Sequence, residues 1–334
     1  MPKPLVSFCT VAMNRLAHVQ KTLSVNLDDN PSDAIQFVLL DYSSGDGLGA
    51  YIKDHFQDHL GSGKLVYYHY PSATSFDHSH SRNMAFRLAE GEVVCNIDAD
   101  NYTGPGFGDY VQEVFQSREN VCLTGLGNPY KLDALGKLCV TKADFIKVTG
   151  YDEHFDGYGF EDFDIVNRLR LAGCEPFTIT NSSFLQAISH ADDERIANQR
   201  FSPEVENIYV HFIDADRSRL LYQLRDGRYV TASIVNMYTI GSRDPFATVE
   251  DEGYPLLHYN LEGNWEQGTW PMDHGNYTFH PVTPSMRREA ILFYTQLRNR
   301  QIMHDNLAHQ RMSVNKTFGS GIVYKNFKNA PIEL

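Results

Sequence analysis

Two groups of acidic side chains could do chemistry in this sequence, and about sixty residues separate them. The first group is Asp98 and Asp100, at the end of the apolar run 93–97. A buried strand that ends on two carboxylates delivers them to the edge of a sheet, and such hard oxygen ligands suit Mg²⁺ or Mn²⁺. Alternation along a strand places both carboxylates on one face, so they can share one ion. We therefore predict a divalent cation at Asp98 and Asp100, with a turn or helix cap as the alternative.

The second group is Glu161, Asp162 and Asp164, at the start of an expected helix over 161–171. Three acids in a first turn are often there only because they complement the helix dipole. Here Tyr158, between two glycines, precedes them and offers an aromatic platform suited to stacking on a sugar. Because burial and like charges raise a carboxyl pKa, one acid can serve as general base while the others accept hydroxyl hydrogen bonds.

Three further side chains stand where expected elements begin or end. Arg82 opens a helix, where its guanidinium could contact a diphosphate or a sugar. Asp41 ends a strand, where it could accept the imide N–H of uracil or simply stabilise a turn. His190 follows the run 184–189 and is a candidate third metal ligand, although a lone histidine is more often a surface or core residue.

The elements that must position these groups alternate between strand and helix. This pattern predicts a mostly parallel α/β sheet flanked by helices, whose ligands bind beyond the carboxyl ends of the strands. The expected strands are 5–11, 36–40, 64–70 and 92–97, and the expected helices are 16–27, 48–59 and 79–89.

A helix over 109–116 and strands over 121–126, 138–141 and 177–179 extend this α/β pattern. After about residue 203 the pattern changes to short strands separated by turns. Beyond it, the runs 208–212, 219–224, 229–238 and 277–279 predict a small antiparallel β subdomain, and 286–308 predicts a long helix. We expect a first domain over 1–204, a β-rich subdomain over 205–284, and a C-terminal helix and tail over 285–334.

Composition argues against nucleic acid as a partner and against a membrane-spanning or secreted protein. With 29 Lys and Arg against 42 Asp and Glu, the formal charge is −13, which argues against nucleic acid as the main partner. An acidic protein also binds an anionic nucleotide poorly without a metal, which favours the cation. No apolar run approaches a transmembrane length, no signal peptide is visible, and the five scattered cysteines are typical of buried free thiols. We expect a cytoplasmic location, with peripheral association at a membrane left open.

Taken together, these motifs resemble GT-A glycosyltransferases, chiefly glycosyltransferase family 2 and the galactosyltransferase-like group. The resemblance covers roughly residues 5 to 195. Residues 6–15 look like the opening strand and nucleotide loop, and 40–46 is similar to the family's Asp-Asp-Gly-Ser-X-Asp stretch, with Tyr42 in place of the second Asp. Ser81-Arg82-Asn83 matches the Ala/Ser-Arg-Asn segment, and Asp98-Ala99-Asp100 matches the metal motif. Residues 150–164 look like the acceptor and catalytic motif of β-1,4-galactosyltransferases and of polypeptide N-acetylgalactosaminyltransferases.

The resemblance implies a role for each matching residue. Asp162 maps onto the general base of an inverting transfer, and a downstream metal-binding histidine maps onto His190. Phe163 stands where the galactosyltransferase group has a further Asp, which argues against an N-acetylglucosamine-type acceptor. The implied metal ligands are Asp98, Asp100 and His190, for Mn²⁺ or Mg²⁺. The implied acceptor-binding residues are Tyr158, Glu161 and Asp164. The implied nucleotide-sugar contacts are Thr10, Ala12, Asn14, Arg15, Asp41, Ser43, Arg82, Asn83 and Asp98.

We therefore expect a metal-dependent, inverting glycosyltransferase that moves a sugar from a nucleotide donor, a UDP-sugar in the first instance, to a hydroxyl of a glycan or glycolipid acceptor. Two other classes stay open. A nucleotidyltransferase acting on a sugar phosphate also needs an Asp-rich metal site, but would carry a glycine-rich loop with Lys or Arg after its first strand, where this chain has Thr10-Val11-Ala12-Met13. A non-catalytic carbohydrate-binding protein would use the acidic clusters for Ca²⁺. Retaining chemistry is a narrower alternative.

Overall fold

The computed structural model describes residues 5–128, 134–189, 198–213, 217–236, 261–262, 265–268 and 279–334. Contacts divide the chain into two compact units. The first comprises Met1–Phe155, Phe160–Ala191 and Ile302–Leu334, and the second comprises Asp156–Gly159 and Asp192–Gln301. The C-terminal tail thus belongs with the first unit, whereas the sequence predicted three consecutive segments.

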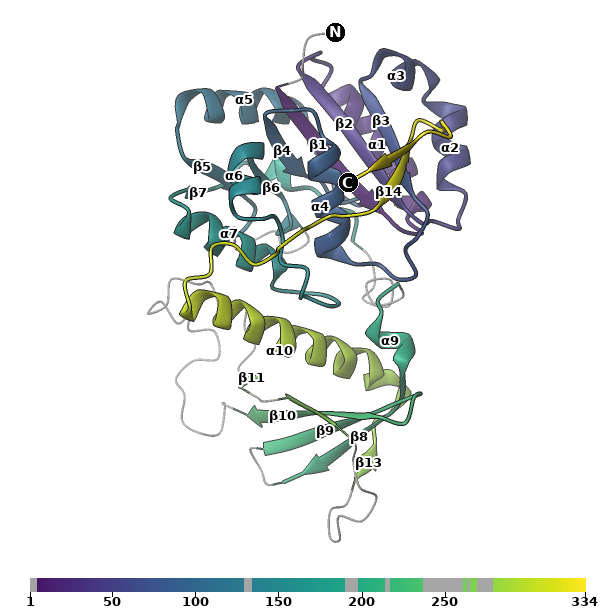
Figure 1. Cartoon of the computed structure of the whole chain (residues 1–334), viewed down its shortest axis with the longest axis vertical. Coiled ribbons are helices and arrows are strands. Elements are labelled where there is room, and N and C mark those ends of the chain that lie inside the picture. The colour runs from purple at the N-terminus through teal and green to yellow at the C-terminus, as the bar shows by residue number, and fades with distance from the viewer. Residues whose placement is uncertain are drawn as a thin grey trace. The chain divides into compact units, whose positions relative to one another are not determined.

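A nine-stranded sheet forms the centre of the first unit (Figure 1), in the order β15-β14-β3-β2-β1-β4-β6-β5-β7. The four strands β3, β2, β1 and β4 run parallel, as predicted, and β6 and β14 flank them as antiparallel neighbours. The strands are β1 (Val6–Ala12), β2 (Ile35–Tyr42), β3 (Leu65–Tyr70), β4 (Val93–Asn96), β5 (Val121–Thr124), β6 (Leu138–Thr141), β7 (Glu175–Thr178), β14 (Ile322–Lys325) and β15 (Pro331–Glu333).

Helices cover both faces of this sheet, because strand residues alternate between two apolar cores. In β2, Phe37 and Leu39 join one core, while Val38 and Leu40 join the other. The first core also takes side chains of α1, α2 and α5, and the second takes those of α4, α6 and α7. The helices are α1 (Leu16–Asp29), α2 (Leu48–His55), α3 (Gln57–Ser62), α4 (His78–Leu88), α5 (Phe107–Ser117), α6 (Lys142–Lys147), α7 (Glu161–Leu171) and the short 3₁₀ helix η2 (Ser182–Leu185).

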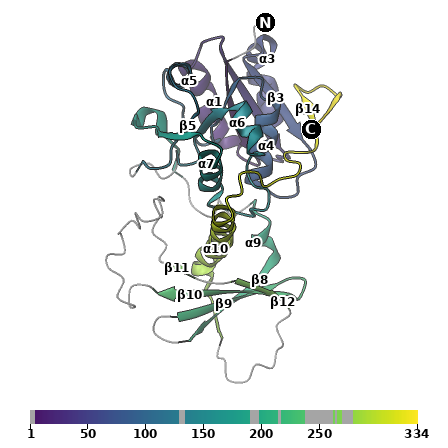
Figure 2. The ribbon, with the colours of Figure 1, turned by 60° about the vertical axis from the view of Figure 1, so that its left-hand side comes forward.

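The second unit contains an antiparallel sheet in the order β11-β10-β9-β8-β13, with β12 paired to β10. α10 packs on this sheet (Figure 2), where Ile291, Tyr294 and Leu297 share one core with Val205 and Tyr222. The predicted antiparallel subdomain is therefore confirmed. Its elements are α9 (Phe201–Glu204), β8 (Val205–Phe212), β9 (Arg217–Leu224), β10 (Tyr229–Asn236), β11 (Leu261–Glu262), β12 (Trp265–Gly268), β13 (His280–Pro281), η4 (Pro284–Met286) and α10 (Arg287–Ala308), whose last residues, from Ile302, belong to the first unit.

Three local features differ from the predicted elements. The helix expected over 48–59 breaks at Phe56, which has non-helical dihedrals and buries its ring in the first core. The predicted strand 277–279 lies mostly outside the described residues. The largest difference is the C-terminal hairpin of β14 and β15, which the sequence did not indicate. All five cysteines are buried and free, and no described helix is long and apolar enough to cross a bilayer.

Candidate active site

Arg82 lies at the centre of the predicted chemistry and joins its two acidic groups. Its Nη2 donates to Asp98 Oδ1 at 3.1 Å, and its Nη1 donates to Asp162 Oδ1 at 3.0 Å and to Glu161 Oε1 at 3.2 Å. The side chains of Arg82 and Glu161 are each 5% exposed, whereas those of Asp98 and Asp162 are 28% and 18% exposed. The two acids predicted to act on donor and acceptor are therefore the ones that reach solvent.

Three elements deliver these side chains to one place. Arg82 lies on α4, which begins after Asp77, whose carboxylate caps the helix by accepting from His80 N. Asp98 follows β4 and is held by Asn96, whose Nδ2 donates to Asp98 Oδ1 at 2.9 Å and to the Gly136 carbonyl at 2.9 Å. The acids of α7 stand in its first turn, where the helix dipole favours negative charge.

The pKa values of the two partly exposed acids, Asp98 and Asp162, are shifted in opposite directions. Burial pushes the pKa of Asp98 upward, but Arg82 and the hydrogen bond from Asn96 outweigh it and hold that pKa below its usual value. Burial raises the pKa of Asp162 to about 7, since Arg82 lowers it only in part and the charges of Glu161 and Asp98 raise it further. A carboxyl with a pKa near neutrality is suited to take up a proton as a general base.

The predicted metal ligands are only partly described. Asp100 accepts a hydrogen bond from Asn101 Nδ2 at 2.7 Å, and its charge, like that of Asp98, acts on the buried Lys137. Burial lowers the pKa of Lys137 to about 8, against those two charges. Within the described ranges no group of three or more His, Cys, Asp or Glu side chains could hold an ion. His190 lies outside the described residues, so the three-ligand site stays a prediction.

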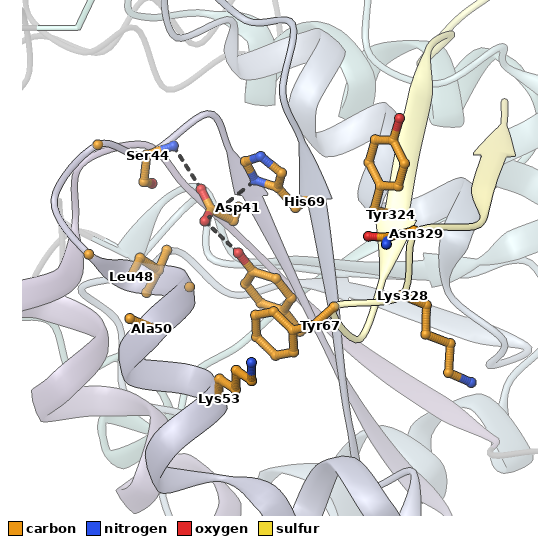
Figure 3. A pocket seen from close by; sticks show the side chains of 14 residues that line it. Asp41, Ser44, Leu48, Ala50, Lys53, Tyr67, His69, Tyr324, Lys328 and Asn329 are labelled. Atoms are coloured by element: carbon orange, nitrogen blue, oxygen red, sulfur yellow. Dashed lines mark hydrogen bonds and ion pairs between the residues drawn. The ribbon is translucent and has the colours of Figure 1, made fainter.

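Asp41 lies at the end of β2, on the wall of a cavity of about 700 Å³. Figure 3 shows its carboxylate between Ser44, His69 and Tyr67: Ser44 N donates to it at 2.8 Å, Tyr67 Oη donates at 2.6 Å, and His69 Nδ1 lies 3.7 Å away. Burial raises the pKa of Asp41, but these three neighbours together bring it below its usual value. An ionised acceptor beside a cavity of this size suits a ligand N–H.

Two family models match consecutive parts of the sequence. Residues 7–132 match glycosyl transferase family 2, and residues 124–196 match the N-terminal domain of galactosyltransferase. Residues 7–196 are a family 2-like, galactosyltransferase-type glycosyltransferase domain. Both matches favour sugar transfer over nucleotidyl transfer and over simple carbohydrate binding. No curated protein sequence matches the chain.

Solved structures with similar folds include other glycosyltransferases. The mannosyltransferase PcManGT of Pyrobaculum calidifontis, with GDP-Man and Mn²⁺, is 18% identical, with a TM-score of 0.44 over 54% of this chain and 55% of its own. S. aureus TarS 1–349 with UDP-GlcNAc is 16% identical, with a TM-score of 0.49 over 60% and 62%. The catalytic domain of Drosophila β1,4-galactosyltransferase 7, with xylobiose, is 14% identical, with a TM-score of 0.39 over 57% and 73%. The matched part spans less than two thirds of the first two structures.

The loops predicted to contact the nucleotide are held by hydrogen bonds between the ends of β1 and β2. Thr10 and Ala12 belong to β1 itself. Asn14 has a left-handed backbone, accepts from Gly45 N at 2.8 Å through Oδ1, and donates from its own N to Ser44 Oγ at 3.0 Å. Ser43 Oγ donates to the Tyr70 carbonyl at 2.7 Å, and Arg15 stands at the N-cap of α1. Asn14 and Ser43 therefore shape the loops, whatever else they bind.

Two residues predicted to contact ligands, Asn83 and Asp164, are instead buried and hydrogen-bonded to other residues of the domain. Asn83 is fully buried: its Nδ2 donates to the Tyr151 carbonyl and to Glu153, and its Oδ1 accepts from Tyr151 N. Asp164 is 1% exposed, and accepts from Arg168 Nε at 2.7 Å and from Asn306 Nδ2 at 2.9 Å. Since both side chains hold the fold together, we carry neither into the proposed function.

Two residues predicted to bind the acceptor remain, Glu161 and Tyr158, and two further residues, Gly136 and His78, lie near the acids without having been predicted. Glu161 is buried against Arg82, and Tyr158 belongs to the second unit, so its stacking role stays a prediction. A Cβ at Gly136 would lie 2.7 Å from Asp98 Oδ2 and 3.3 Å from Asp162 Oδ2, so only glycine fits there without a shift. His78, in the first turn of α4, has its pKa lowered by burial, and Glu161 and Arg82 act on it in opposite directions. Sequence spacing carried no signal for Gly136 or His78.

Proposed function

We propose that this glycosyltransferase domain transfers a sugar from a nucleotide sugar to an acceptor hydroxyl with inversion, and that Asp162 is the general base. The observation that carries the proposal is the Arg82 bridge, which holds Asp98 and Asp162 at 3.1 and 3.0 Å from one guanidinium. Arg82 is a positioning residue here, because both of its terminal nitrogens donate hydrogen bonds to the acidic side chains.

The proposed reaction follows from the state of Asp162. Its ionised carboxylate accepts the proton of an acceptor hydroxyl, and the oxygen attacks the anomeric carbon from the face opposite the nucleotide. The bond from that carbon to the diphosphate oxygen breaks, and its electron pair leaves with the nucleoside diphosphate. A pKa of about 7 makes the carboxylate abundant at neutral pH while leaving it basic enough to take the proton.

The donor set at the end of β4 fits a hard divalent cation. Asp98 and Asp100 offer carboxylate oxygens, Asp98 reaches solvent, and His190 is the proposed third ligand. When bound, Mn²⁺ or Mg²⁺ would neutralise the charge of the departing diphosphate. We propose Asp41 as the acceptor for a base N–H, with Thr10, Ala12 and Arg15 at the nucleotide loop, and Tyr158 and Glu161 toward the acceptor, a glycan or glycolipid.

A donor screen followed by one substitution tests the proposal. Thermal-shift assays with UDP, UDP-sugars and GDP-mannose, with and without Mn²⁺, should show a stabilisation that needs both nucleotide and metal. Asp162→Asn should then lower turnover by about a thousandfold while leaving UDP affinity unchanged. Asp109→Asn, an exposed first-turn acid of α5, is the matched control and should keep full activity.

Two results would contradict this assignment. Full turnover by Asp162→Asn would remove Asp162 as the base. A product with the same anomeric configuration as the donor, read by proton NMR, would exclude inversion.

A further inference from the structure

The C-terminal hairpin forms one wall of the cavity beside Asp41, although it lies outside the stretch 7–196 that the family models match. β14 adds to the sheet antiparallel to β3, with Tyr324 opposite His69. Figure 3 shows the cavity between α2, which contributes Lys53, and the hairpin, which contributes Tyr324, Lys328 and Asn329. A segment about 250 residues away in sequence thus supplies one wall.

Two hydrogen bonds fix the turn of this hairpin on β3. Asn326 N donates to the Tyr67 carbonyl at 2.8 Å, and Tyr67 N donates to Asn326 Oδ1 at 2.9 Å. Asn326 and Phe327 both have positive φ, at 46° and 62°, a conformation that is costly for a bulky residue. The turn therefore holds Phe327 in one position, against its own backbone preference.

The chemistry of the cavity is that of a site for a planar, polar ring. Phe327 stacks on Tyr67 with ring centroids 4.6 Å apart and planes 14° apart, and Tyr67 Oη donates to the carboxylate of Asp41. Lys53 Nζ lies 5.9 Å from the centre of the Phe327 ring, and Lys328 lines the same cavity. One ionised hydrogen-bond acceptor, three aromatic rings and two lysine side chains line a cavity of about 700 Å³, a size typical of small-molecule sites.

We propose that the hairpin turn is a specificity element for the donor nucleotide, in which Phe327 packs against the base. Asp41 takes the ring N–H, so the base is one with an N–H beside a carbonyl, uracil or guanine, rather than adenine or cytosine. The inference rests on the proposed function, because it assumes that a nucleotide sugar is the donor.

Binding measurements on the full chain test this role. Isothermal titration with UDP in the presence of Mn²⁺ should show about a tenfold loss of affinity for Phe327→Ala, the usual effect of losing one aromatic contact to a base. Phe327→Tyr, which keeps the ring, should bind UDP as the unaltered protein does. Lys325→Ala should lose no affinity. Lys325 is the control on the same hairpin, on the opposite face beside Tyr68 and Glu90.

A probe without a base separates base contact from a general loss of folding. Pyrophosphate with Mn²⁺ should bind equally to the unaltered protein and to Phe327→Ala. If UDP binds the unaltered protein and Phe327→Ala equally, the hairpin has no role in base binding, and the proposed transfer stands. If the unaltered protein binds ADP and CDP as tightly as UDP and GDP, the selection for a ring N–H is wrong. If it binds no nucleotide at all, both proposals fall together.

Discussion

At the scale of single residues, the stability of the site should depend on pH through Asp162. Its pKa is raised by burial and by the charges of Glu161 and Asp98 to about 7 in the folded chain, against an ordinary value of 3.8 for an Asp carboxyl. A carboxyl with a raised folded pKa stabilises the native state most below its unfolded pKa, and that contribution is lost as pH rises from about 4 through about 7. The ionised Asp162 is therefore a cost to the fold at pH 8.

Asp162→Asn removes that cost, so we expect the variant to be more stable than the unaltered protein at pH 8. The expected gain, measured without metal by denaturant unfolding, is on the order of 4 kcal/mol at pH 8 and close to zero at pH 4. The kcat/KM of the unaltered enzyme should fall below about pH 7 for the same reason. A variant that is less stable than the unaltered protein at pH 8 would show that the Asp162–Arg82 ion pair outweighs the repulsion.

Gly136 offers a second test at the same scale. A methyl group there would press on Asp98 Oδ2 at 2.7 Å and on Arg82 Nη2 at 3.1 Å, so these groups must move. Since displacements below 1 Å are costly in a preorganised site, Gly136→Ala should lower kcat about tenfold to a hundredfold. Gly61→Ala, on α3 with nothing within 4 Å of the new methyl group, should keep full activity and gain a little helix stability. Equal activities of the two variants would contradict the predicted crowding.

At the scale of elements, α10 and α7 are joined through one buried amide. Asn306 Nδ2 donates to Asp152 Oδ2 at 2.8 Å and to Asp164 Oδ1 at 2.9 Å, and all three residues are buried. Burial raises the pKa of Asp164, whereas Arg168 and this hydrogen bond act to lower it. The Asn306 amide near the end of α10 thus offsets part of the desolvation free energy of the two buried carboxylates, Asp152 and Asp164.

Removing that amide should destabilise the first unit more than most substitutions do. We expect Asn306→Ala to lower the free energy of unfolding by about 3 kcal/mol, since two buried charged acceptors lose a donor. Asn306→Asp should cost more, because it adds a third carboxylate to the pair. Asp305→Ala, an exposed neighbour on the same helix that loses only surface pairs with Arg311 and His309, should change stability by less than about 1 kcal/mol. Chemical denaturation measures all three, and similar values would rule out the bracing role.

Sequence reasoning located some elements better than others, for physical reasons. The helix predicted over 161–171 has those bounds in the structure, because a glycine precedes it, acids open it and Gly173 follows its end. The break at Phe56 was missed, since it depends on tertiary burial of the ring rather than on a local breaker. The resemblance implied metal and catalytic roles for Asp98 and Asp162, but the Arg82 bridge between them depends on side-chain geometry that no spacing encodes.

At the scale of the whole chain, the first sheet is finished by its last residues. β14 and β15 are short, and β14 pairs with β3 across more than 250 positions, so no local sequence pattern could predict them. Val323 is nevertheless fully buried in the core that α4 and α7 share, and Asn326 bonds to both backbone groups of Tyr67. The hairpin therefore covers the edge of β3, which would otherwise present unpaired backbone groups.

Deleting residues 321–334 should consequently destabilise the first unit and expose a pairing edge. We expect a loss of several kcal/mol, from the buried Val323 side chain and the lost strand pairing. Hydrogen exchange should speed up at the Tyr67 amide, because that N–H donates to Asn326 Oδ1 in the full chain. The exchange rate of the Val38 amide, in the central strands, should change least. Ile322→Ala is the matched control and should leave stability nearly unchanged, since this side chain is 48% exposed and its backbone pairing to Glu333 is kept. If the truncated chain matched the full chain in denaturation midpoint and in exchange at Tyr67, the hairpin would not be an integral edge of the sheet. Its role would then be confined to the cavity it borders.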